Sequence, residues 1–414
     1  MWEPFESELH LSRVKELLTM EVYMKILKNK IVGLTIFSVL SLTGCNNSSS
    51  ESNVATEFDP QDTFRYETFG DEAFWTDVLK WNEVVTTISP VAALGVGLKV
   101  DSEAVPKETL NAVLASEVLL NDPKTTLALL KMDAVVGIKA TVEEDGTVSK
   151  FGITCALCHS VVDDSVTKGI GKRLDGWPAR DLNPGLIISL SPFFDDKPEK
   201  RATYASWGPG RFDDYFNQDG VSAPVLITPA WGLKGVALET YTGEGEISSW
   251  NRYIAVTQMG GIGNFQSDHL GLDIKVEKDL VAPKLPALLK YQLSLQPPKP
   301  PLGSFNKVAA ARGKVVFEGK GTCSSCHSGE LFTDAPVLHD PFETGSNPLH
   351  ANRASTGKYR TTPLKGVWQH PPYFHDGAHA TLADVVDHYD GVDVLNTKLS
   401  ADEKSDLVEF LKSL

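Results

Sequence analysis

Two pentapeptides in this chain of 414 residues combine side chains that bind cofactors and metals. Both read Cys-x-x-Cys-His, and they supply Cys155, Cys158, His159, Cys323, Cys326 and His327. Two thiols at this spacing can each form a thioether with a vinyl group of a haem, and the histidine that follows then projects toward the iron. Because the two motifs use four of the five cysteines, we expect two covalently bound c-type haems and no disulfide.

Two other kinds of site also use Cys-x-x-Cys pairs. A thioredoxin-like redox pair lies at a strand-to-helix turn and does not need the histidine that follows. Two such pairs can also build a structural zinc site, but that site would leave both histidines without a role. The two complete pentapeptides therefore favour haem over both alternatives.

The fifth cysteine ends a segment with the features of an export signal. Residues 24–30 are basic, residues 31–42 are apolar but too short to span a bilayer, and Leu42-Thr43-Gly44-Cys45 follows. The segment resembles a bacterial lipoprotein signal, which implies cleavage before Cys45 and lipidation of that cysteine. A generic signal peptide that contains a cysteine is the alternative. We expect Met24 to be the true start, because residues 1–23 fit no signal peptide.

Export and haem attachment support each other, because bacteria attach c-type haem after translocation. We therefore expect the protein at the periplasmic face of a bacterial membrane, held by a lipid anchor. The net charge is −15 and no basic patch stands out, so a nucleic-acid partner is not expected. The acidic surface suits solvation, or contact with a basic redox partner protein.

Composition divides the chain into five segments. They are a non-mature N-terminus (1–44), a lipidated cysteine with a flexible tether (45–60), an N-terminal haem domain (61–295), a stiff proline-rich linker (296–301) and a C-terminal cytochrome c domain (302–414). The expected fold is mostly α, with two c-type cytochrome domains, irregular Gly/Pro-rich insertions and a small β-hairpin.

Local patterns place several elements around the two motifs. Residues 138–142 and 147–153 alternate in polarity around a Glu-Glu-Asp-Gly turn, which predicts a hairpin that leads into the first motif. Residues 57–130 read as mainly helical, residues 160–247 as irregular, and residues 285–295 as a helix.

The C-terminal segment has the helix pattern of a cytochrome c domain. A helix over 307–318 precedes the second motif, and a last helix starts at Ser400 with Glu403 completing a capping box. In cytochromes c the first and last helices cross at a glycine, with aromatic residues in the contact. Gly313, Phe317 and Phe410 fit that crossing.

A string of residues near the C-terminus carries a family resemblance. It comprises Arg360-Thr361-Thr362-Pro363-Leu364-Lys365-Gly366-Val367, then Pro372-Tyr373-Phe374-His375-Asp376-Gly377, then Thr381-Leu382 and Val385-Val386. The string resembles the C-terminal haem domain of the bacterial dihaem cytochrome c peroxidase superfamily. That superfamily includes the dihaem enzyme that matures the tryptophan-derived cofactor of methylamine dehydrogenase. The middle of the chain matches much less well.

The resemblance implies a second ligand for the haem of the C-terminal domain. The family commonly uses a methionine on the helix after the His-Asp-Gly element, but this chain has Tyr389 at the matching position and no methionine after Met259. The cofactor-maturing branch has a tyrosine there. Tyr389 is therefore a candidate iron ligand, with His375 or His388 as alternatives.

The second ligand of the first haem is left open by the sequence. Met259 is one of few methionines in the mature chain, and a thioether ligand stabilises ferrous haem. His269 or an open coordination position are the alternatives, and packing in the core is the usual role of a methionine. Basic residues near the motifs are candidate partners of haem propionates: Lys172, Arg173, Arg180 and Arg211 for the first haem, and Arg353 and Arg360 for the second.

Together these features favour a periplasmic, lipid-anchored dihaem cytochrome that transfers electrons. A dihaem peroxidase or peroxide-using oxidase is the alternative, with hydrogen peroxide as its substrate. A haem-based sensor is a third class, but no output domain is visible in the sequence.

Overall fold

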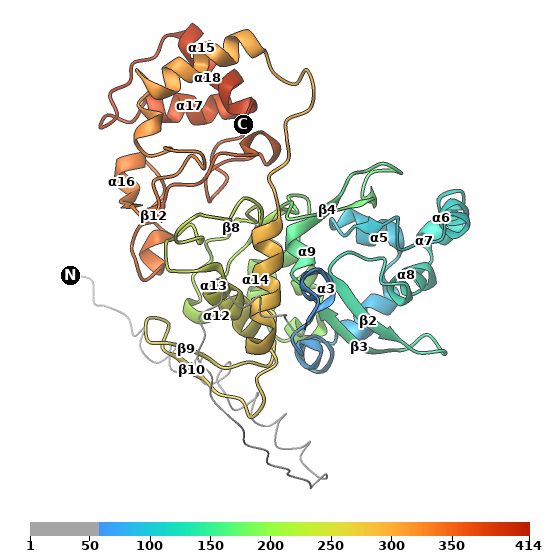
Figure 1. Cartoon of the computed structure of the whole chain (residues 1–414). Helices are drawn as coiled ribbons and strands as arrows, with labels where there is room; N and C mark the ends of the chain where they lie inside the picture. The colour runs from blue at the N-terminus through green and yellow to red at the C-terminus, as the bar shows by residue number, and fades with distance from the viewer. Residues whose placement is uncertain (1–57) are drawn as a thin grey trace, which may run out of the picture. The chain divides into compact units, whose positions relative to one another are not determined.

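The computed structural model describes residues 58–414 (Figure 1). The expected signal segment, Cys45 and nearly all of the tether lie outside the described residues. Helices make up 41% of the structure and strands 11%, which confirms the mostly α class. Within the described part, every helix is too short or too polar to cross a membrane.

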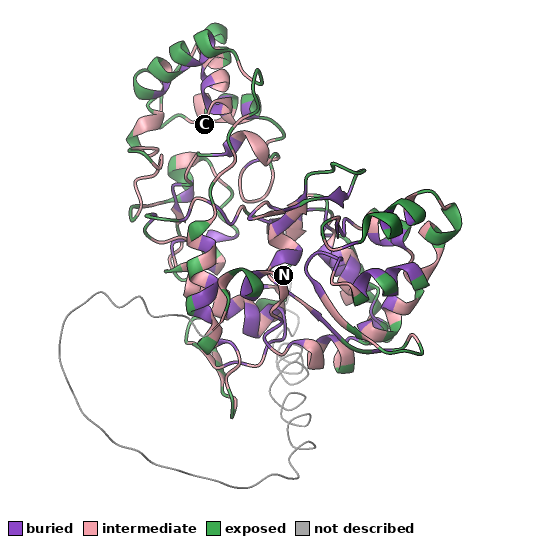
Figure 2. Ribbon diagram, turned by 45° about the vertical axis from the view of Figure 1, so that its right-hand side comes forward, coloured by how far each residue is buried: buried purple, intermediate pink, exposed green. Residues whose placement is uncertain are grey.

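The chain before the first motif forms a set of short helices and one hairpin. The elements are α3 (Pro60–Tyr66), a π-helix (Ala73–Val78), α4 (Trp81–Val84), a 3-10 turn (Val85–Thr87), α5 (Pro90–Gly95), β1 (Val100–Asp101), α6 (Lys107–Leu114), α7 (Glu117–Asn121), α8 (Pro123–Lys131), β2 (Ile138–Val142) and β3 (Val148–Ile153). Figure 2 shows helices with a green, exposed side and a purple, buried side, although α7 buries no residue.

The predicted hairpin is confirmed, and aromatic packing holds it against the helices. Strands β2 and β3 pair antiparallel, with Ile138 opposite Ile153. Phe151 of β3 stacks on Trp81 at a ring-centroid distance of 5.5 Å, and Trp75 of the π-helix packs against both rings. Because β3 ends two residues before Cys155, this packing fixes where the first motif begins.

The segment between the motifs is built from short elements. They are α9 (Ala156–His159), β4 (Ser160–Val162), β5 (Ile170–Gly171), β6 (Arg173–Asp175), α10 (Pro184–Ser189), a 3-10 turn (Pro192–Phe194), α11 (Pro198–Ala205), β7 (Arg211–Phe212), α12 (Phe216–Asp219), β8 (Val225–Leu226), α13 (Ile247–Tyr253), a π-helix (Ile254–Gln258), β9 (Phe265–Ser267), β10 (Leu272–Ile274), a 3-10 turn (Ala282–Lys284) and α14 (Leu285–Ser294). The described strands form two-stranded sheets: β1 pairs with β5, β2 with β3, β4 with β6, β7 with β8, β9 with β10, and β11 (Leu338–His339) with β12 (Tyr359–Arg360).

The C-terminal segment has the predicted helix crossing. Its elements are α15 (Lys307–Glu318), a 3-10 turn (Cys323–Ser325), β11 (Leu338–His339), α16 (Pro341–Thr344), a 3-10 turn (Ala351–Arg353), β12 (Tyr359–Arg360), a 3-10 turn (Val367–Gln369), α17 (Leu382–Asp390) and α18 (Ala401–Lys412). Helices α15 and α18 pack directly on each other (Figure 1).

Gly313 is the residue that lets these two helices approach so closely. A side chain at this position would overlap the backbone of Asp406 in α18. Next to it, Phe317 meets Phe410 edge-on at 5.1 Å, and both rings are buried in the core of this segment. The capping box of Ser400 and Glu403 starts α18 as predicted.

The proline-rich linker connects α14 to α15 along the surface of the C-terminal segment. The indole N–H of Trp368 donates to the carbonyl of Pro298 at 3.3 Å. The described residues, 58–414, lie within one compact unit. The division into two haem domains at 296–301 therefore stays a prediction from composition.

Candidate cofactor site

The first motif forms one helical turn at the end of β3. The amide of His159 donates to the carbonyl of Cys155 at 3.2 Å, so the first cysteine and the histidine lie on the same face of the turn. Gly137 has a positive φ of 79° and no room for a side chain, because the backbone of Leu157 lies against it. The hairpin can therefore approach the motif closely only with glycine at this position.

The chain after the first motif turns back and holds it in place. The amide of Gly176 donates to the carbonyl of His159 at 2.7 Å, and that of Ala179 donates to the carbonyl of Cys158 at 2.9 Å. Asp175 lies beside them and accepts from Arg65 and Tyr291, both at 2.6 Å. These contacts tie α3 and α14 to the motif.

The second motif repeats the same local geometry in a tighter turn. The amide of His327 donates to the carbonyl of Cys323 at 2.9 Å, and a 3-10 turn begins at Cys323. Phe317 of α15 packs near the His327 ring, at 6.5 Å between centroids. The helix crossing of α15 and α18 therefore supports this histidine.

Both motif histidines have one ring nitrogen fixed by a backbone carbonyl. Nδ1 of His159 lies 3.0 Å from the oxygen of Thr228, and Nδ1 of His327 lies 3.0 Å from the oxygen of Phe332. Burial lowers the pKa of both imidazoles, so they are neutral at neutral pH. Nδ1 then carries the proton, and Nε2 keeps a free lone pair that can bind a metal.

The four motif cysteines are unpaired thiols. Burial raises the pKa of Cys155 and Cys158 to about 12 and that of Cys323 to about 11. A thioredoxin-type pair works through a thiol of lowered pKa and closes to a disulfide. The pairs of this chain have neither property, so the geometry does not support the thioredoxin alternative.

One cavity of about 710 Å³ is lined by both motifs. All six motif residues lie on its wall, together with mostly apolar side chains such as Ile187, Leu226 and Leu407. A large, mainly apolar cavity with a few polar groups is typical of a cofactor site. The cavity, the free thiols and the oriented imidazoles fit covalently bound haem.

Arg180 gives an independent sign that an anion belongs in this cavity. One of its nitrogens donates to the carbonyl of His370 at 3.1 Å, while its two other guanidinium nitrogens are buried without a partner. Burial and the nearby Arg211 lower the pKa of Arg180 to about 10. A buried cation is costly without a counter-charge, and a haem propionate would supply one.

The other basic candidates for propionate binding have different partners. Arg173 pairs with Asp101 at 3.1 Å and Lys172 with Glu103 at 3.1 Å, while Arg211 donates to the carbonyl of Asp376 at 2.7 Å.

Arg353 already has two carboxylate partners, so its contact with a haem propionate stays a prediction. Its nitrogens lie 2.8 Å from Asp213 and 2.7 Å from Asp219. Arg360 lines the cavity but donates to the carbonyls of Glu239, Thr240 and Thr361.

The three ligand candidates of the C-terminal segment differ in what their polar atoms contact. Tyr389 lines the cavity near Cys323 and Cys326, its hydroxyl makes no hydrogen bond to the described residues, and burial raises its pKa to about 12. His388 lies off the cavity wall, and its Nε2 contacts the carbonyl of Thr344 at 2.9 Å.

His375 lines the cavity, but its Nε2 is hydrogen-bonded to a neighbouring tyrosine. The Tyr359 hydroxyl donates to the carbonyl of Asn347 at 2.7 Å, so its oxygen can only accept from Nε2 of His375 at 3.2 Å. That nitrogen therefore carries a proton and cannot bind iron in this arrangement. The geometry favours Tyr389 of the three.

Met259 lines the cavity at the point where two π-helices meet. It follows the π-helix Ile254–Gln258, and its carbonyl accepts from the indole of Trp75, in the other π-helix, at 2.9 Å. Met259 is 6% exposed, in a core cluster against which Cys155 packs. Single π-helical turns are frequent at functional sites.

His269 lies off the cavity wall, with Nε2 2.8 Å from the carbonyl of Arg353.

Sequence reasoning missed a short repeat whose two copies line the cavity. Thr228-Pro229-Ala230-Trp231-Gly232 and Thr362-Pro363-Leu364-Lys365-Gly366 share Thr-Pro and a glycine three residues after the proline, and both glycines have positive φ (70° and 77°). The first Thr-Pro supplies the carbonyl that contacts Nδ1 of His159, whereas the carbonyl at Nδ1 of His327 belongs to Phe332; Thr228 and Thr362 both line the cavity. The shared Thr-Pro-x-x-Gly spacing could have revealed it.

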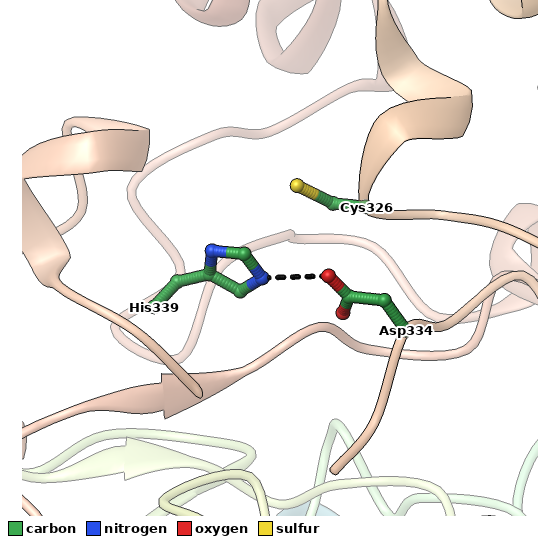
Figure 3. A group of neighbouring side chains, drawn as sticks. All are labelled: Cys326, Asp334 and His339. Atoms are coloured by element: carbon green, nitrogen blue, oxygen red, sulfur yellow. Dashed lines mark hydrogen bonds and ion pairs between the residues drawn. The ribbon is translucent and has the colours of Figure 1, made fainter. Parts of the chain in front are cut away.

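Cys326, Asp334 and His339 form the one group of three or more potential metal ligands within residues 58–414 (Figure 3). Burial opposes a charge on His339, but hydrogen bonds of 2.9 Å to Glu343 and Asp334 outweigh it and raise its pKa. Both of its ring nitrogens are thus occupied by carboxylates. The described residues contain no cluster that joins the two cysteine pairs, as the zinc alternative requires.

Comparison with known proteins agrees with the resemblance seen in the sequence. A cytochrome c551 peroxidase of Nitrosomonas europaea is 26% identical over 289 residues, covering 65% of this chain and 76% of that protein. The methylamine utilization protein MauG of Methylorubrum extorquens is 31% identical over 121 residues, covering 25% of this chain and 34% of MauG. This chain thus spans about a third of MauG. No protein-family model matches the chain.

Solved structures add only a weak likeness. A MauG-like protein associated with microbial copper homeostasis aligns with a TM-score of 0.26 and 21% identity, covering 34% of this chain and 58% of that one. The score is too low to carry an argument. The sequence relatives, at modest identity, support the dihaem cytochrome c peroxidase superfamily.

The contacts of Tyr389 generate a prediction about the second haem. Removing its hydroxyl in Tyr389→Phe leaves no buried group unpaired, so the fold should persist. If Tyr389 binds iron, the absorption spectrum of one haem should change and its reduction potential should rise, because a hard anionic ligand stabilises ferric iron. Optical and EPR spectra with redox titration test this, with Tyr66→Phe, a tyrosine off the cavity wall, as the control that should leave the spectra unchanged. An unchanged spectrum in Tyr389→Phe would refute the ligand role.

The position of Met259 generates a second prediction. Met259→Leu conserves volume and should cost less than about 1.5 kcal/mol of stability, so the haem pocket should survive. A methionine-ligated ferric haem shows a weak sulfur-to-iron band in the near infrared, which Met259→Leu and Met259→His should both abolish. Met259→His should also lower the potential of that haem, within the roughly 0.8 V range that axial ligands span. Spectra and potentials that stay unchanged would leave Met259 as a packing residue.

Proposed function

We propose that the mature chain is a dihaem c-type cytochrome of the peroxidase type, which takes electrons from a redox partner protein and passes them to hydrogen peroxide. The observation that carries this proposal is the single cavity whose wall holds both complete Cys-x-x-Cys-His motifs. The names of the relatives support the reaction class.

Covalent haem supplies an iron that exchanges single electrons and, where a coordination position is open, reacts with peroxide. The chain's own residues prepare the site for it. Cys155, Cys158, Cys323 and Cys326 would attach two such groups, and His159 and His327 present neutral Nε2 atoms because their Nδ1 atoms are held by carbonyls. Arg180 offers its unpaired nitrogens to a carboxylate in the cavity.

Reduction of peroxide consumes two electrons and two protons and releases two molecules of water. The electrons would enter from a partner protein, and the acidic net charge of −15 suits a partner with a basic surface. The cavity is mostly apolar, so it limits the water that competes with peroxide.

A second candidate is an electron carrier without peroxide chemistry. It is favoured by the two candidate ligands on the cavity wall, Met259 and Tyr389, because an iron with two protein ligands exchanges electrons without binding a substrate. The two candidates differ in spin state: a high-spin or reductively opened haem fits the peroxidase, and two low-spin haems fit the carrier.

The test of the proposal uses the protein produced with the haem-attachment machinery. Intact mass should show two haem additions, with one lost in Cys155→Ala/Cys158→Ala and the other in Cys323→Ala/Cys326→Ala. Peroxide should then oxidise a reduced small cytochrome in the presence of the wild type and fail to do so with either double variant. Two low-spin haems that ignore peroxide would favour the carrier, and bound zinc without haem would end both proposals.

We further propose that the protein is held at the periplasmic face of a bacterial membrane through Cys45. The support is the basic, apolar and Leu-Thr-Gly-Cys sequence of residues 24–45. In Cys45→Ser the haem protein should move from the membrane fraction to the soluble periplasmic fraction, as immunoblots of fractionated cells would record. Asn47 lies outside the signal pattern, so Asn47→Ser serves as a control that stays anchored. Unchanged membrane association of Cys45→Ser would contradict the anchor.

A further inference from the structure

A buried polar cluster borders the cavity, built from segments far apart in sequence. Asp214 follows β7, Tyr241 precedes α13, and His350 precedes the turn at Ala351–Arg353. Asp214 is 4% exposed and His350 is 1% exposed. The His350 ring lies between those of Tyr215 and Tyr241, at 5.1 and 5.4 Å between centroids.

The carboxylates next to Asp214 are fully engaged. Asp213 accepts from Arg353, and Glu244 accepts from Tyr215, Ser355 and Thr242. Asp214 differs, because neither of its carboxylate oxygens has a hydrogen-bond donor in the described structure. Its ionisable neighbour is His350, whose Nε2 lies 3.4 Å from Oδ1 and whose two nitrogens also make no hydrogen bond.

Burying the Asp214 carboxylate in this way costs free energy unless a ligand in the cavity supplies a hydrogen-bond donor. A buried carboxylate without hydrogen bonds loses several kcal/mol of solvation, and one imidazole at 3.4 Å does not replace it. The Tyr241 hydroxyl, on the same cavity wall, is also buried without a partner among the described residues. The unpaired atoms therefore indicate that the cavity binds a polar ligand, which both donates and accepts hydrogen bonds.

Comparison of the acidic residues on the cavity wall singles out Asp214. Within the described chain they are Asp214, Glu239 and Asp390. Glu239 accepts from the amide of Ile247, and Asp390 accepts from Lys404, Thr397 and Leu399. Of the three, Asp214 alone has both oxygens available to take up or give a proton.

We propose that Asp214, positioned by His350, is the acid–base group that handles the proton of hydrogen peroxide in this cavity; this inference rests on the proposed peroxidase function. One oxygen of Asp214 accepts the proton of the peroxide oxygen that reacts. The O–O bond then breaks with two electrons supplied by the reduced haem protein, and Asp214 gives the proton to the departing oxygen, which leaves as water. Two external protons complete the second water, so that atoms and charges balance.

His350 acts through Asp214 and is a positioning residue. Its ring is held by Tyr215 and Tyr241, and its Nε2 lies 3.4 Å from Oδ1 of the Asp214 carboxylate. Tyr253 fixes the backbone of Asp214, because its hydroxyl donates to the Asp214 carbonyl at 2.5 Å. These contacts hold the carboxylate on the cavity wall without occupying its oxygens.

The experiment measures the second-order rate constant for peroxide by stopped-flow mixing with the holo-protein. Asp214→Asn should lower this constant by about 100-fold or more, the usual contribution of a positioned acid–base group. The resting spectra and both reduction potentials should stay close to those of the wild type. Glu244→Gln is the matched control: it removes a carboxylate of the same cluster that is not on the cavity wall, and its rate should stay within about twofold of the wild type.

The outcomes separate this inference from the proposed function. If the wild type does not react with peroxide, both the proposed function and the role of Asp214 are refuted. If the wild type reacts and Asp214→Asn reacts equally fast, only the role of Asp214 is refuted. A loss in Glu244→Gln as large as in Asp214→Asn would mean a structural effect and would also overturn it. If Asp214→Asn loses haem, Asp214→Glu and His350→Gln take its place, and unchanged rate constants in both would overturn the proposal.

Discussion

A histidine presents Nε2 to a metal in a defined direction only if its other ring nitrogen is held, and both motif histidines meet this condition through backbone carbonyls. The carbonyls come from loops, so the loops must be fixed as firmly as the motifs. Much of the surrounding structure does this for the first motif: Gly232 turns the loop that follows Thr228, and the amides of Gly176 and Ala179 bond to the motif carbonyls. The irregular chain between the motifs thus supports the hydrogen bond of His159, whereas the loop after the second motif supplies the carbonyl of Phe332 for His327.

Those features that depend on local pattern could be predicted from sequence. The hairpin ending at Ile153 and the helices around Gly313 and Phe410 follow from polarity period, turn residues and capping. The residues that would attach haem follow from the Cys-x-x-Cys-His spacing. The division into haem domains and the identity of the second ligands rest on composition and resemblance, and no contact in the structure settles them.

Other features depend on tertiary contacts that no local pattern records. Arg353 reads as a free surface cation, but Asp213 and Asp219 come from more than a hundred residues away. The isolation of Asp214 is likewise invisible in the sequence, where it is one of many acidic residues. The shared Thr-Pro-x-x-Gly spacing was visible, but it is too short to stand out without knowledge of what its carbonyl binds.

The choice between carrier and peroxidase depends on whether one haem iron keeps a coordination position that no protein atom occupies. The sequence favoured the carrier, because candidate ligands can be named for both haems. The relatives favour the peroxidase. The structure also favours the peroxidase, because a carboxylate without hydrogen-bond partners on the cavity wall has no evident use in a carrier.

Arg353 and Arg360 have a consequence for the molecule as a whole. Both belong to the C-terminal half, yet Arg353 is neutralised by Asp213 and Asp219, and Arg360 donates to the carbonyls of Glu239 and Thr240. Separating the halves would break these buried contacts and expose both guanidinium groups to water, so the contacts oppose opening of the two halves. Electron tunnelling between two cofactors depends steeply on their separation, so in the proposed dihaem protein this interface would hold that separation constant.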